Sequence, residues 1–379
     1  MSTAQTTPLP SPSLTDERAT DLLQPLTALG ELTSLQLQQL RSSSLELSHL
    51  CCLPQLQQLV LSFTAVWTRR SISRLSAAVL QRLSSLQHLD LGRCFGIQRS
   101  AVPQLAAMTC LTHLWVLDLR VEGAAADAVL PLPQLRELGC AYIAGPAAAA
   151  SSAPQLPQLT RLCVGQLWVN YFDFEDQAFD DAPHAADALH STRGCLLGLL
   201  PLPQLQQLEV SVEDSDWAPL AAELAQQTSL TSLSLRREAG DFNDDGVDLG
   251  PLVPALQQLG QLQHLTCCGA KLDLGFWEAI AGMPQLQSLE LEECSLQLLH
   301  LSLLHRCAAL EEISLTYCRG AESDALVAGM LIVKPGLRRL VLRDDEDSRW
   351  EKYRYFPEQD PLDDIKQLAA FVGVQLWLE

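Results

Sequence analysis

The chain has 379 residues, of which 45 are acidic and 25 are basic, so its formal net charge at pH 7 is −20. Leucine alone accounts for 77 residues, far more than an ordinary mixed core uses, which favours a periodic architecture. Hydrophobic residues make up 47 % of the chain, which excludes wholesale disorder, and the negative charge disfavours binding to nucleic acids and anionic membranes.

The N-terminal residues form a polar segment, MSTAQTTPLPSPSLTDERAT, that is rich in Ser, Thr and Pro. It lacks the basic region followed by an apolar core that is typical of a secretory signal. No stretch of the chain has the roughly 18 uninterrupted apolar residues of a membrane span. We therefore expect a disordered leader at residues 1–14. Twelve cysteines in a chain without a secretory signal indicate reduced thiols and a cytoplasmic location.

A phrase of the form L-x-x-L-x-L recurs twelve times, mostly at intervals of 24 or 25 residues. Its L-x-L part predicts a short strand whose alternate side chains point inward. One such unit cannot bury its own apolar face, whereas stacked units share a continuous core. The copies begin at Leu32, Leu56, Leu86, Leu111, Leu135, Leu159, Leu205, Leu230, Leu262, Leu286, Leu310 and Leu337.

The twelve copies resemble the leucine-rich repeat family over residues 28–345. The resemblance implies an α/β fold, a curved solenoid with a parallel β-sheet on the concave face and helices and turns on the convex face. We expect this domain to cover residues 15–360, with one strand beginning near the second leucine of each copy.

Several segments between the strands predict convex helices, because their apolar residues are spaced three and four apart. They are Ile72–Leu83, Trp217–Ala225, Phe276–Ala281 and Asp324–Met330. Near the C-terminus, the phrase DPLDDIKQLAAF predicts a helix and VGVQLWLE a final short strand. Together they indicate a cap at residues 361–379, and we expect its outer face to be more polar because it closes the stack.

Cysteine follows the second leucine by five residues in three copies, at Cys94, Cys294 and Cys318. These copies resemble the cysteine-containing repeats of F-box leucine-rich proteins, which implies the role of a substrate-recognition adaptor of a ubiquitin ligase. Only 31 residues precede the first copy, and they contain no F-box-like pattern. We expect the three thiols to be buried against the next repeat, and Cys163 and Cys268 to face outward.

Two columns of side chains are predicted to face outward on the concave sheet, because residues alternate in direction along each strand. Their varied composition favours recognition of one irregular protein surface over recognition of a polymer. The first column is Gln58, His88, His113, Glu137, Arg161, Gln207, Ser232, His264, Ser288, Glu312 and Arg339. The second is Val60, Asp90, Trp115, Gly139, Cys163, Glu209, Ser234, Thr266, Glu290, Ser314 and Val341.

Neighbouring positions in these columns bring His88, His113, Asp90 and Trp115 together. Two imidazoles and a carboxylate resemble half of a metal site. The sequence offers no further ligand, so we interpret the group as a solvated polar patch rather than a metal site. We regard His88, His113 and Trp115 as candidate partner contacts.

A cluster of glutamates on two adjacent repeats is the second candidate contact. It consists of Glu290, Glu292, Glu293, Glu311 and Glu312, with Arg236 and Arg237 before it and Arg338, Arg339 and Arg343 after it. One interpretation is an acidic site for a basic peptide, and the other is an ordinary solvated surface with internal ion pairs. The candidate contacts are Glu290, Glu292, Glu312 and Arg339.

Two insertions, near residues 166–195 and 238–250, interrupt the repeat. The first mixes aromatic and acidic residues, and it either docks on a basic partner or packs back on the scaffold. In the second, Asp241, Asn243 and Asp245 match the start of an EF-hand loop, but Leu252 stands where that loop needs a glutamate. We therefore interpret the second insertion as a polar turn.

Catalytic motifs are absent from the chain: it has no phosphate-binding loop, nucleophile elbow, H-E-x-x-H helix or C-x-x-C pair. We therefore expect a non-catalytic protein-protein interaction scaffold without a cofactor, metal or small-molecule substrate. Its partner is expected to be another protein with a basic surface, and neither a nucleic acid nor a membrane. The alternative to the adaptor role is a structural protein of the cytoskeleton or the ciliary axoneme.

Overall fold

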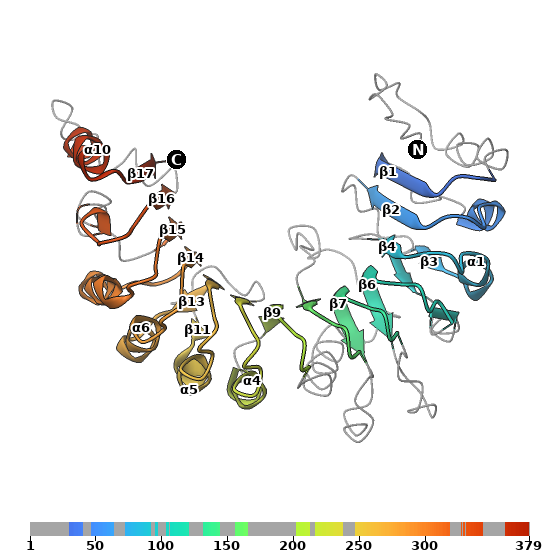
Figure 1. The fold of residues 1–379 in the computed structure, drawn as a ribbon, viewed down its shortest axis with the longest axis horizontal. Coiled ribbons are helices and arrows are strands. Elements are labelled where there is room, and N and C mark those ends of the chain that lie inside the picture. The colour runs from blue at the N-terminus through green and yellow to red at the C-terminus, as the bar shows by residue number, and fades with distance from the viewer. Residues whose placement is uncertain are drawn as a thin grey trace, which may run out of the picture.

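Thirteen parallel strands form one sheet that follows the chain in order (Figure 1). They are β1 Ser34–Leu40, β2 Gln58–Phe63, β4 His88–Asp90, β6 His113–Arg120, β7 Glu137–Ala144, β8 Arg161–Val164, β9 Gln207–Val212, β10 Ser232–Arg237, β12 His264–Cys268, β14 Ser288–Glu292, β15 Glu312–Thr316, β16 Arg339–Arg343 and β17 Gln375–Leu378. This computed structural model describes residues 30–40, 47–63, 73–91, 95–97, 104–105, 107–120, 132–144, 156–165, 202–212, 217–237, 247–318, 327, 329, 331–343 and 361–378.

The repeat places the strands as predicted. Twelve of them begin one residue before the second leucine of a copy, or before Ile313 in the eleventh copy. Every pair of neighbouring strands in the sheet is parallel. The predicted curved leucine-rich repeat solenoid is therefore confirmed, and β17 adds a thirteenth strand beside β16.

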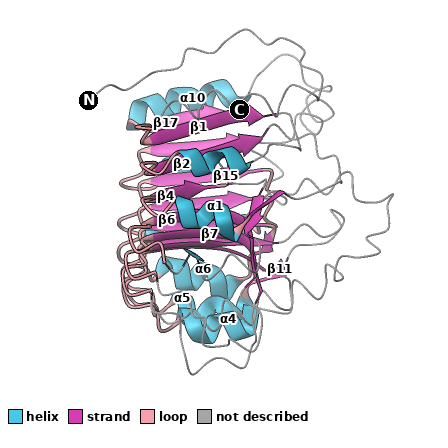
Figure 2. Cartoon of the chain, turned by 90° about the vertical axis from the view of Figure 1, so that its right-hand side faces the viewer, coloured by secondary structure: helices cyan, strands magenta, loops and turns pink. Residues whose placement is uncertain are grey.

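Figure 2 shows the strands stacked on one another from the side. They pair in register, apart from an irregularity between Leu37 and Leu40 on β1. Leu265 pairs with Leu289, which in turn pairs with Ile313. The main chain repeats the same bonds, because the N–H groups of Gln87 and Thr112 each donate to the carbonyl of the preceding copy at 2.8 Å. Leucines at equivalent positions therefore form one continuous buried ladder, which accounts for the leucine content.

Helices and turns lie on the convex side of the sheet (Figure 1). They are η4 Leu47–Cys52, α1 Ala77–Arg82, α4 Trp217–Leu224, η8 Gly250–Leu252, α5 Val253–Leu256, α6 Leu274–Ala281, α7 Leu298–Leu301, η9 Ser302–Arg306 and α10 Pro361–Val372. Packed helices need about 8–10 Å each, whereas strands are about 4.8 Å apart. Stacking such units curves the solenoid with its sheet on the inside.

Two of the predicted convex helices are confirmed, at α4 and α6. Asp273 caps the N-terminus of helix α6: its carboxylate accepts a hydrogen bond from the Phe276 N–H at 2.8 Å, the usual cap of a helix N-terminus. In the segment expected as Asp324–Met330, the described residues 327 and 329 are helical. The convex layer thus mixes α-helices with 3-10 turns.

The expected helix over Ile72–Leu83 is only partly right. Strand β3 (Ser73–Leu75) pairs with β5 (Phe95–Ile97) in a small separate sheet, and the helix starts only after Ser76, which has an extended backbone. A second small sheet pairs β11 (Val247–Asp248) with β13 (Ala270–Lys271). At β3, main-chain bonding to a neighbouring connection replaces the first turn of the expected helix.

A left-handed residue turns the chain away from the concave strand in three consecutive repeats of the C-terminal half. Gly269, Glu293 and Tyr317 each stand four residues beyond the second leucine or isoleucine, and their φ angles are 71°, 53° and 53°. Each N–H continues the main-chain ladder to the next strand, at 2.8–2.9 Å. Glycine adopts this conformation without steric cost, whereas glutamate and tyrosine are strained in it.

The C-terminal helix and strand occur where the sequence predicts them. The exposed described side chains of α10 include the polar Lys366 and Gln367, but also Phe371, which is 87 % exposed. A more polar outer face is therefore found only in part among the described residues. Among the described helices, none is long and apolar enough to cross a membrane.

The first prediction tests the leucine ladder. Replacing Leu289, which is fully buried, by alanine should lower the free energy of unfolding by about 2–5 kcal/mol, because the substitution leaves a cavity. The matched control is Leu299→Ala on α7, where the side chain is 84 % exposed and the change should be within about 0.5 kcal/mol. Urea unfolding followed by circular dichroism measures both, and equal effects of the two variants would contradict the ladder.

Candidate functional site

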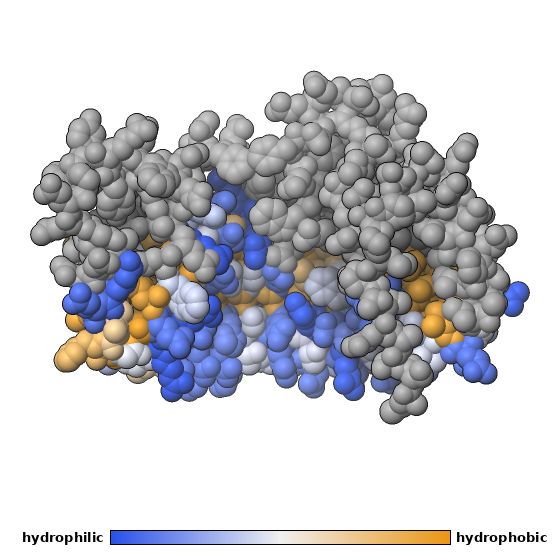
Figure 3. All heavy atoms as spheres, turned by 90° about the horizontal axis from the view of Figure 1, so that it is seen from above, coloured by the Kyte–Doolittle hydropathy of each residue, from blue (hydrophilic) through white to orange (hydrophobic). Residues whose placement is uncertain are grey.

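The two predicted outward columns are confirmed by the strand register. Gln58, His88 and His113 pair in sequence at one level, and Val60, Asp90 and Trp115 pair at the next. The register continues through every later strand up to β17. Figure 3 views the molecule from above and shows hydrophilic side chains along one edge of the arc.

A group of polar and aromatic side chains lies on β4, β6, β7 and β8, and we call it the histidine–tryptophan patch (His88, His113, Trp115, Glu137 and Arg161). The rings of His88 and His113 are 5.0 Å apart between centroids. His113 Nε2 lies 3.4 Å from a Glu137 carboxylate oxygen, and Arg161 lies 3.9 Å from the other oxygen of that carboxylate. The three candidate contacts His88, His113 and Trp115 are therefore brought together, as the sequence predicts.

Trp115 lies flat on the sheet because its neighbour in the second column is Gly139. A Cβ atom at Gly139 would lie 2.3 Å from the indole Cε3, which no side chain other than hydrogen allows. The guanidinium of Arg161, two strands away on β8, covers the indole, with Cζ 5.3 Å from the ring centroid, within the range of a cation–π contact. The tryptophan is thus held in one orientation.

The electrostatics of the histidine–tryptophan patch favour neutral imidazole at His88. Burial lowers the pKa of His88 and the adjacent His113 lowers it further, while Asp90 and Glu137 oppose this shift. Within the part of the chain that the structure describes, no group of three or more His, Cys, Asp or Glu side chains is placed to hold a metal ion.

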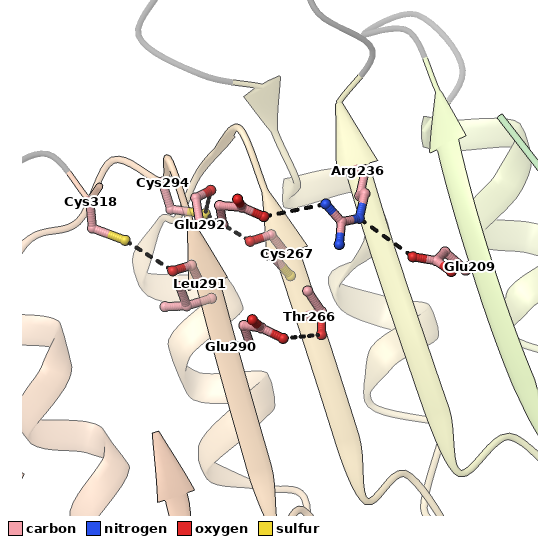
Figure 4. A network of polar contacts seen from close by, with 9 residues as sticks. All are labelled: Glu209, Arg236, Thr266, Cys267, Glu290, Leu291, Glu292, Cys294 and Cys318. Atoms are coloured by element: carbon pink, nitrogen blue, oxygen red, sulfur yellow. Dashed lines mark hydrogen bonds and ion pairs between the residues drawn. The ribbon is translucent and has the colours of Figure 1, made fainter. Parts of the chain in front are cut away.

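The acidic cluster is partly neutralised by an arginine from two strands away (Figure 4). Arg236 on β10 reaches over β12 and donates to a Glu292 oxygen at 3.3 Å. On the other side its Nε lies 3.5 Å from a Glu209 oxygen without forming a hydrogen bond, so this contact is an ion pair alone. Glu292 therefore belongs to an internal ion-pair network, which we call the Arg236 network (Glu209, Arg236 and Glu292).

The other candidate contacts of the C-terminal half remain open to solvent. Glu290, Glu312 and Arg339 are exposed. Thr266 donates a hydrogen bond to Glu290 at 3.3 Å (Figure 4), and Glu312 pairs in register with Arg339 on the next strand. Glu311 is engaged by Arg338 at 3.0 Å. Of the five glutamates of the cluster, Glu292 and Glu311 are thus paired with arginines.

The two patches lie far apart on the same face. Six strand steps separate β6, which carries Trp115, from β14, which carries Glu290. At about 4.8 Å per step this is roughly 29 Å along the sheet. One partner that contacted both patches would therefore have to cover most of the concave face between them.

The repeat cysteines are buried to different extents. Cys294 is fully buried, and its thiol donates to the Cys267 carbonyl at 3.3 Å, whereas Cys318 is half-buried and donates to the Leu291 carbonyl at 3.4 Å (Figure 4). The expected burial is therefore confirmed for Cys294 and only in part for Cys318. Cys94 lies outside the described residues.

The register places Cys163 in the second outward column, as predicted, but its side chain is buried there. Cys163 is 3 % exposed, because Glu209 covers it with a carboxylate oxygen 3.4 Å from Sγ. Burial, and then the charge of Glu209, raise the pKa of this thiol well above its usual range. Cys268 is half-buried, and burial and Glu292 raise its pKa to about 12.

Neither insertion can be compared with its prediction. Residues 166–195 and the acidic stretch from Asp241 to Gly246 lie outside the described residues. Leu252, at the position that an EF-hand reserves for glutamate, is fully buried at the end of η8.

Some residues of the two patches were not among the predicted contacts. The sequence named Arg236 only as a flanking charge, although a third outward column, two residues beyond the second, places Arg236, Cys268 and Glu292 at one level. Gly139 was assigned to the second column without a role. A glycine next to a tryptophan in an outward column would have been the sequence signal, because the missing side chain leaves room for the indole ring over the neighbouring strand.

No protein-family model and no curated protein sequence matches the chain. Among solved structures it is similar to an internalin from Listeria monocytogenes, with 15 % identity and a TM-score of 0.41, over 86 % of this chain and 80 % of that one. It is also similar to TLR13 from a complex with ssRNA13, with 18 % identity and a TM-score of 0.41, over 84 % of this chain. The chain spans 44 % of the TLR13 chain. The fold assignment rests on the strand register of this chain.

The second prediction concerns the Arg236 network. Arg236→Met leaves Glu209 and Glu292 without their shared cation, so the free energy of unfolding should fall by about 1–3 kcal/mol. The matched control is Arg338→Met, because its 3.0 Å pair with Glu311 is more exposed to water and should contribute less than about 1 kcal/mol. Urea unfolding compares the two.

A rescue variant identifies charge as the cause. Adding Glu209→Gln and Glu292→Gln to Arg236→Met should restore part of the lost stability, since it removes the uncompensated carboxylates. If Arg236→Met is no more destabilising than Arg338→Met, the network has no special role in the stability of the sheet.

The third prediction concerns the thiols. Cys52 and Cys110 are exposed and should react quickly with iodoacetamide in the folded protein, whereas Cys267, Cys294 and Cys307 are buried and should be protected. Burial also raises the pKa of Cys307 to about 11, which lowers the fraction of reactive thiolate at neutral pH. Peptide mass spectrometry measures the labelling, with urea-unfolded protein as control. Labelling of Cys294 as fast as Cys52 would contradict the packing described here.

Proposed function

We propose that this chain is a non-catalytic scaffold whose concave sheet binds another protein. The observation that carries the proposal is the register of the sheet, which presents two columns of varied polar and aromatic side chains on parallel strands. Side chains fixed in this way lose little freedom when a partner binds, which favours affinity. Tryptophan and arginine, which dominate the energetics of many interfaces, meet in the histidine–tryptophan patch.

A partner with a basic surface is supported by the carboxylates that the protein leaves open. Glu290 and Glu312 are exposed, and neither forms an ion pair with another described residue. Lysine or arginine of a partner can bind both without displacing an internal pair. The net charge of −20 disfavours a nucleic acid or an anionic membrane as the ligand.

The cellular role that we propose is a substrate-recognition adaptor of a ubiquitin ligase, with a cytoskeletal or ciliary-axoneme protein as the alternative and a cytoplasmic location in both. The adaptor role is supported by the resemblance of the cysteine-containing repeats, whose Cys294 and Cys318 make equivalent thiol–carbonyl contacts. Affinity purification with mass spectrometry separates the roles: ligase subunits favour the first and tubulin-associated proteins the second.

The fourth prediction tests the concave site with a partner identified in this way. Glu290→Lys combined with Glu312→Lys should leave the fold intact, because both side chains are exposed. Binding should weaken by about 2–5 kcal/mol, since attraction to a basic surface becomes repulsion. Wild-type binding should also weaken as salt is added, because surface charges are screened.

The matched control reverses two carboxylates on the convex side, Glu223→Lys on α4 and Glu278→Lys on α6. It changes the net charge by the same amount and should leave binding within about twofold of the wild type, apart from long-range steering. Titration calorimetry measures all three proteins. Unchanged affinity of the concave variant would place the binding surface elsewhere on the protein.

A further inference from the structure

The imidazole of His113 is held by the threonine that precedes it in the chain. Its Nδ1 lies 2.8 Å from the Thr112 hydroxyl oxygen, and this hydroxyl donates to the Gln87 carbonyl at 2.9 Å. A hydroxyl has one hydrogen, so an oxygen that has donated it can only accept further bonds. Nδ1 therefore carries the hydrogen of the bond between His113 and Thr112.

The same threonine bond recurs in copies that have no histidine beside it. The Thr160 hydroxyl donates to the Arg136 carbonyl at 3.1 Å. The Thr231 hydroxyl donates to the Gln206 carbonyl at 3.2 Å. Neither threonine is followed by a histidine, so the direction of the bond belongs to the repeat and not to the imidazole. The stacking of the repeats thus sets the tautomer of His113.

The other ring nitrogen of His113 faces a carboxylate. Nε2 lies 3.4 Å from a Glu137 oxygen, and the two side chains are 32 % and 30 % exposed. In a neutral imidazole with its hydrogen on Nδ1, Nε2 has only a lone pair. Two hydrogen-bond acceptors thus face each other on the concave sheet, and neither can satisfy the other. A positively charged donor from outside the chain can bind both.

The neighbouring groups favour a cation at this point. The ring of His88 lies beside that of His113, with centroids 5.0 Å apart, and burial and then His113 lower the pKa of His88, which keeps that ring neutral near pH 7. Asp90 on the same strand adds a negative charge. Arg161 on β8 is close, but its Nη1 lies 3.9 Å from the other Glu137 oxygen, too far for a hydrogen bond.

We propose that His113 Nε2 and the Glu137 carboxylate together bind one lysine ammonium of the protein partner. An ammonium has three hydrogens on a compact head, so it can donate to both acceptors at once, whereas the planar fork of arginine suits the two oxygens of a single carboxylate. The inference rests on the proposed function, because it gives a basic partner one defined contact on the histidine–tryptophan patch.

A proton competes with the ammonium for the same lone pair. Protonation of Nε2 turns the ring into an imidazolium, which pairs with Glu137 and repels a second cation. The contact is therefore open above the pH range in which histidine titrates and closed below it. Among the described residues, the charged or titratable groups around His113 are His88 and Asp90 on β4, Glu137 on β7 and Arg161 on β8.

The fifth prediction tests the tautomer in the free protein. Nitrogen-15 NMR of histidine-labelled protein at about pH 7.5, above the usual histidine range, should show His113 with its hydrogen on Nδ1. Thr112→Val removes the acceptor of that hydrogen and should release the Nε2–H form, which donates to Glu137. Thr112→Ser keeps the hydroxyl and should keep the Nδ1–H form. An Nε2–H ring in the wild type overturns the assignment.

Two probes test the contact itself: a lysine tetrapeptide and the same peptide with every amine acetylated. At about pH 7.5 the lysine peptide should shift the His113 ring signals saturably, and at about pH 5.5 it should not, because the ring is then charged. The acetylated peptide should cause no shift at either pH. Glu137→Gln should weaken the binding of the lysine peptide about two- to fivefold, the effect of one exposed ion pair.

The matched control is Glu312→Gln, which removes an exposed carboxylate of the same outward column on β15 and should leave the His113 titration unchanged. No shift with the lysine peptide, an equal shift with the acetylated peptide, or equal effects of the two variants overturns the contact. These results are independent of partner binding at Glu290 and Glu312, so this contact and the proposed function can fail separately.

Discussion

Leucine side chains that stack in register across parallel strands hold every other feature of this protein in place. Each fully buried leucine contributes about 1.5–3 kcal/mol, and each repeat contacts only its neighbours, so stability is built up along the chain. The ladder uses only the inward half of every strand. The outward half is therefore free to vary, and the register carries each outward residue to a defined position beside its neighbours.

On the concave face of the sheet, charged and aromatic side chains are held in place by contacts between different strands. Arg236 lies between Glu209 and Glu292 and holds two carboxylates that would otherwise repel each other on the sheet. Trp115 is fixed in a different way, by the empty space above Gly139 and by Arg161. Both arrangements link strands that are neighbours or near neighbours in space but about 24 to 56 residues apart in sequence.

The sequence predicts the strands, their parallel order and both outward columns, because a leucine period of this regularity leaves one way to bury the ladder. It does not predict how far a side chain reaches sideways. Arg236 crosses β12 to pair with Glu292, so the charge of this glutamate is compensated within the protein. Glu209 covers Cys163, so this outward thiol is buried. The exposed apolar side chains Leu368, Phe371 and Val372 of α10 also escaped prediction, since apolar spacing predicts a helix but does not say which of its apolar residues are buried.

Strands β8 and β9 pair in register although the first leucines of their copies are 46 residues apart, against 24 for β7 and β8. The bond that opens the pair, from the Gln206 N–H to the Thr160 carbonyl, is 2.9 Å long, as elsewhere in the sheet. The stack thus fixes the strands and imposes no length on what joins them, and the entropy of closing a longer connection grows only slowly. Insertions in the segments that connect the strands can therefore be accommodated without changing the order of the outward columns. Each connecting segment can vary in length and sequence independently of the others.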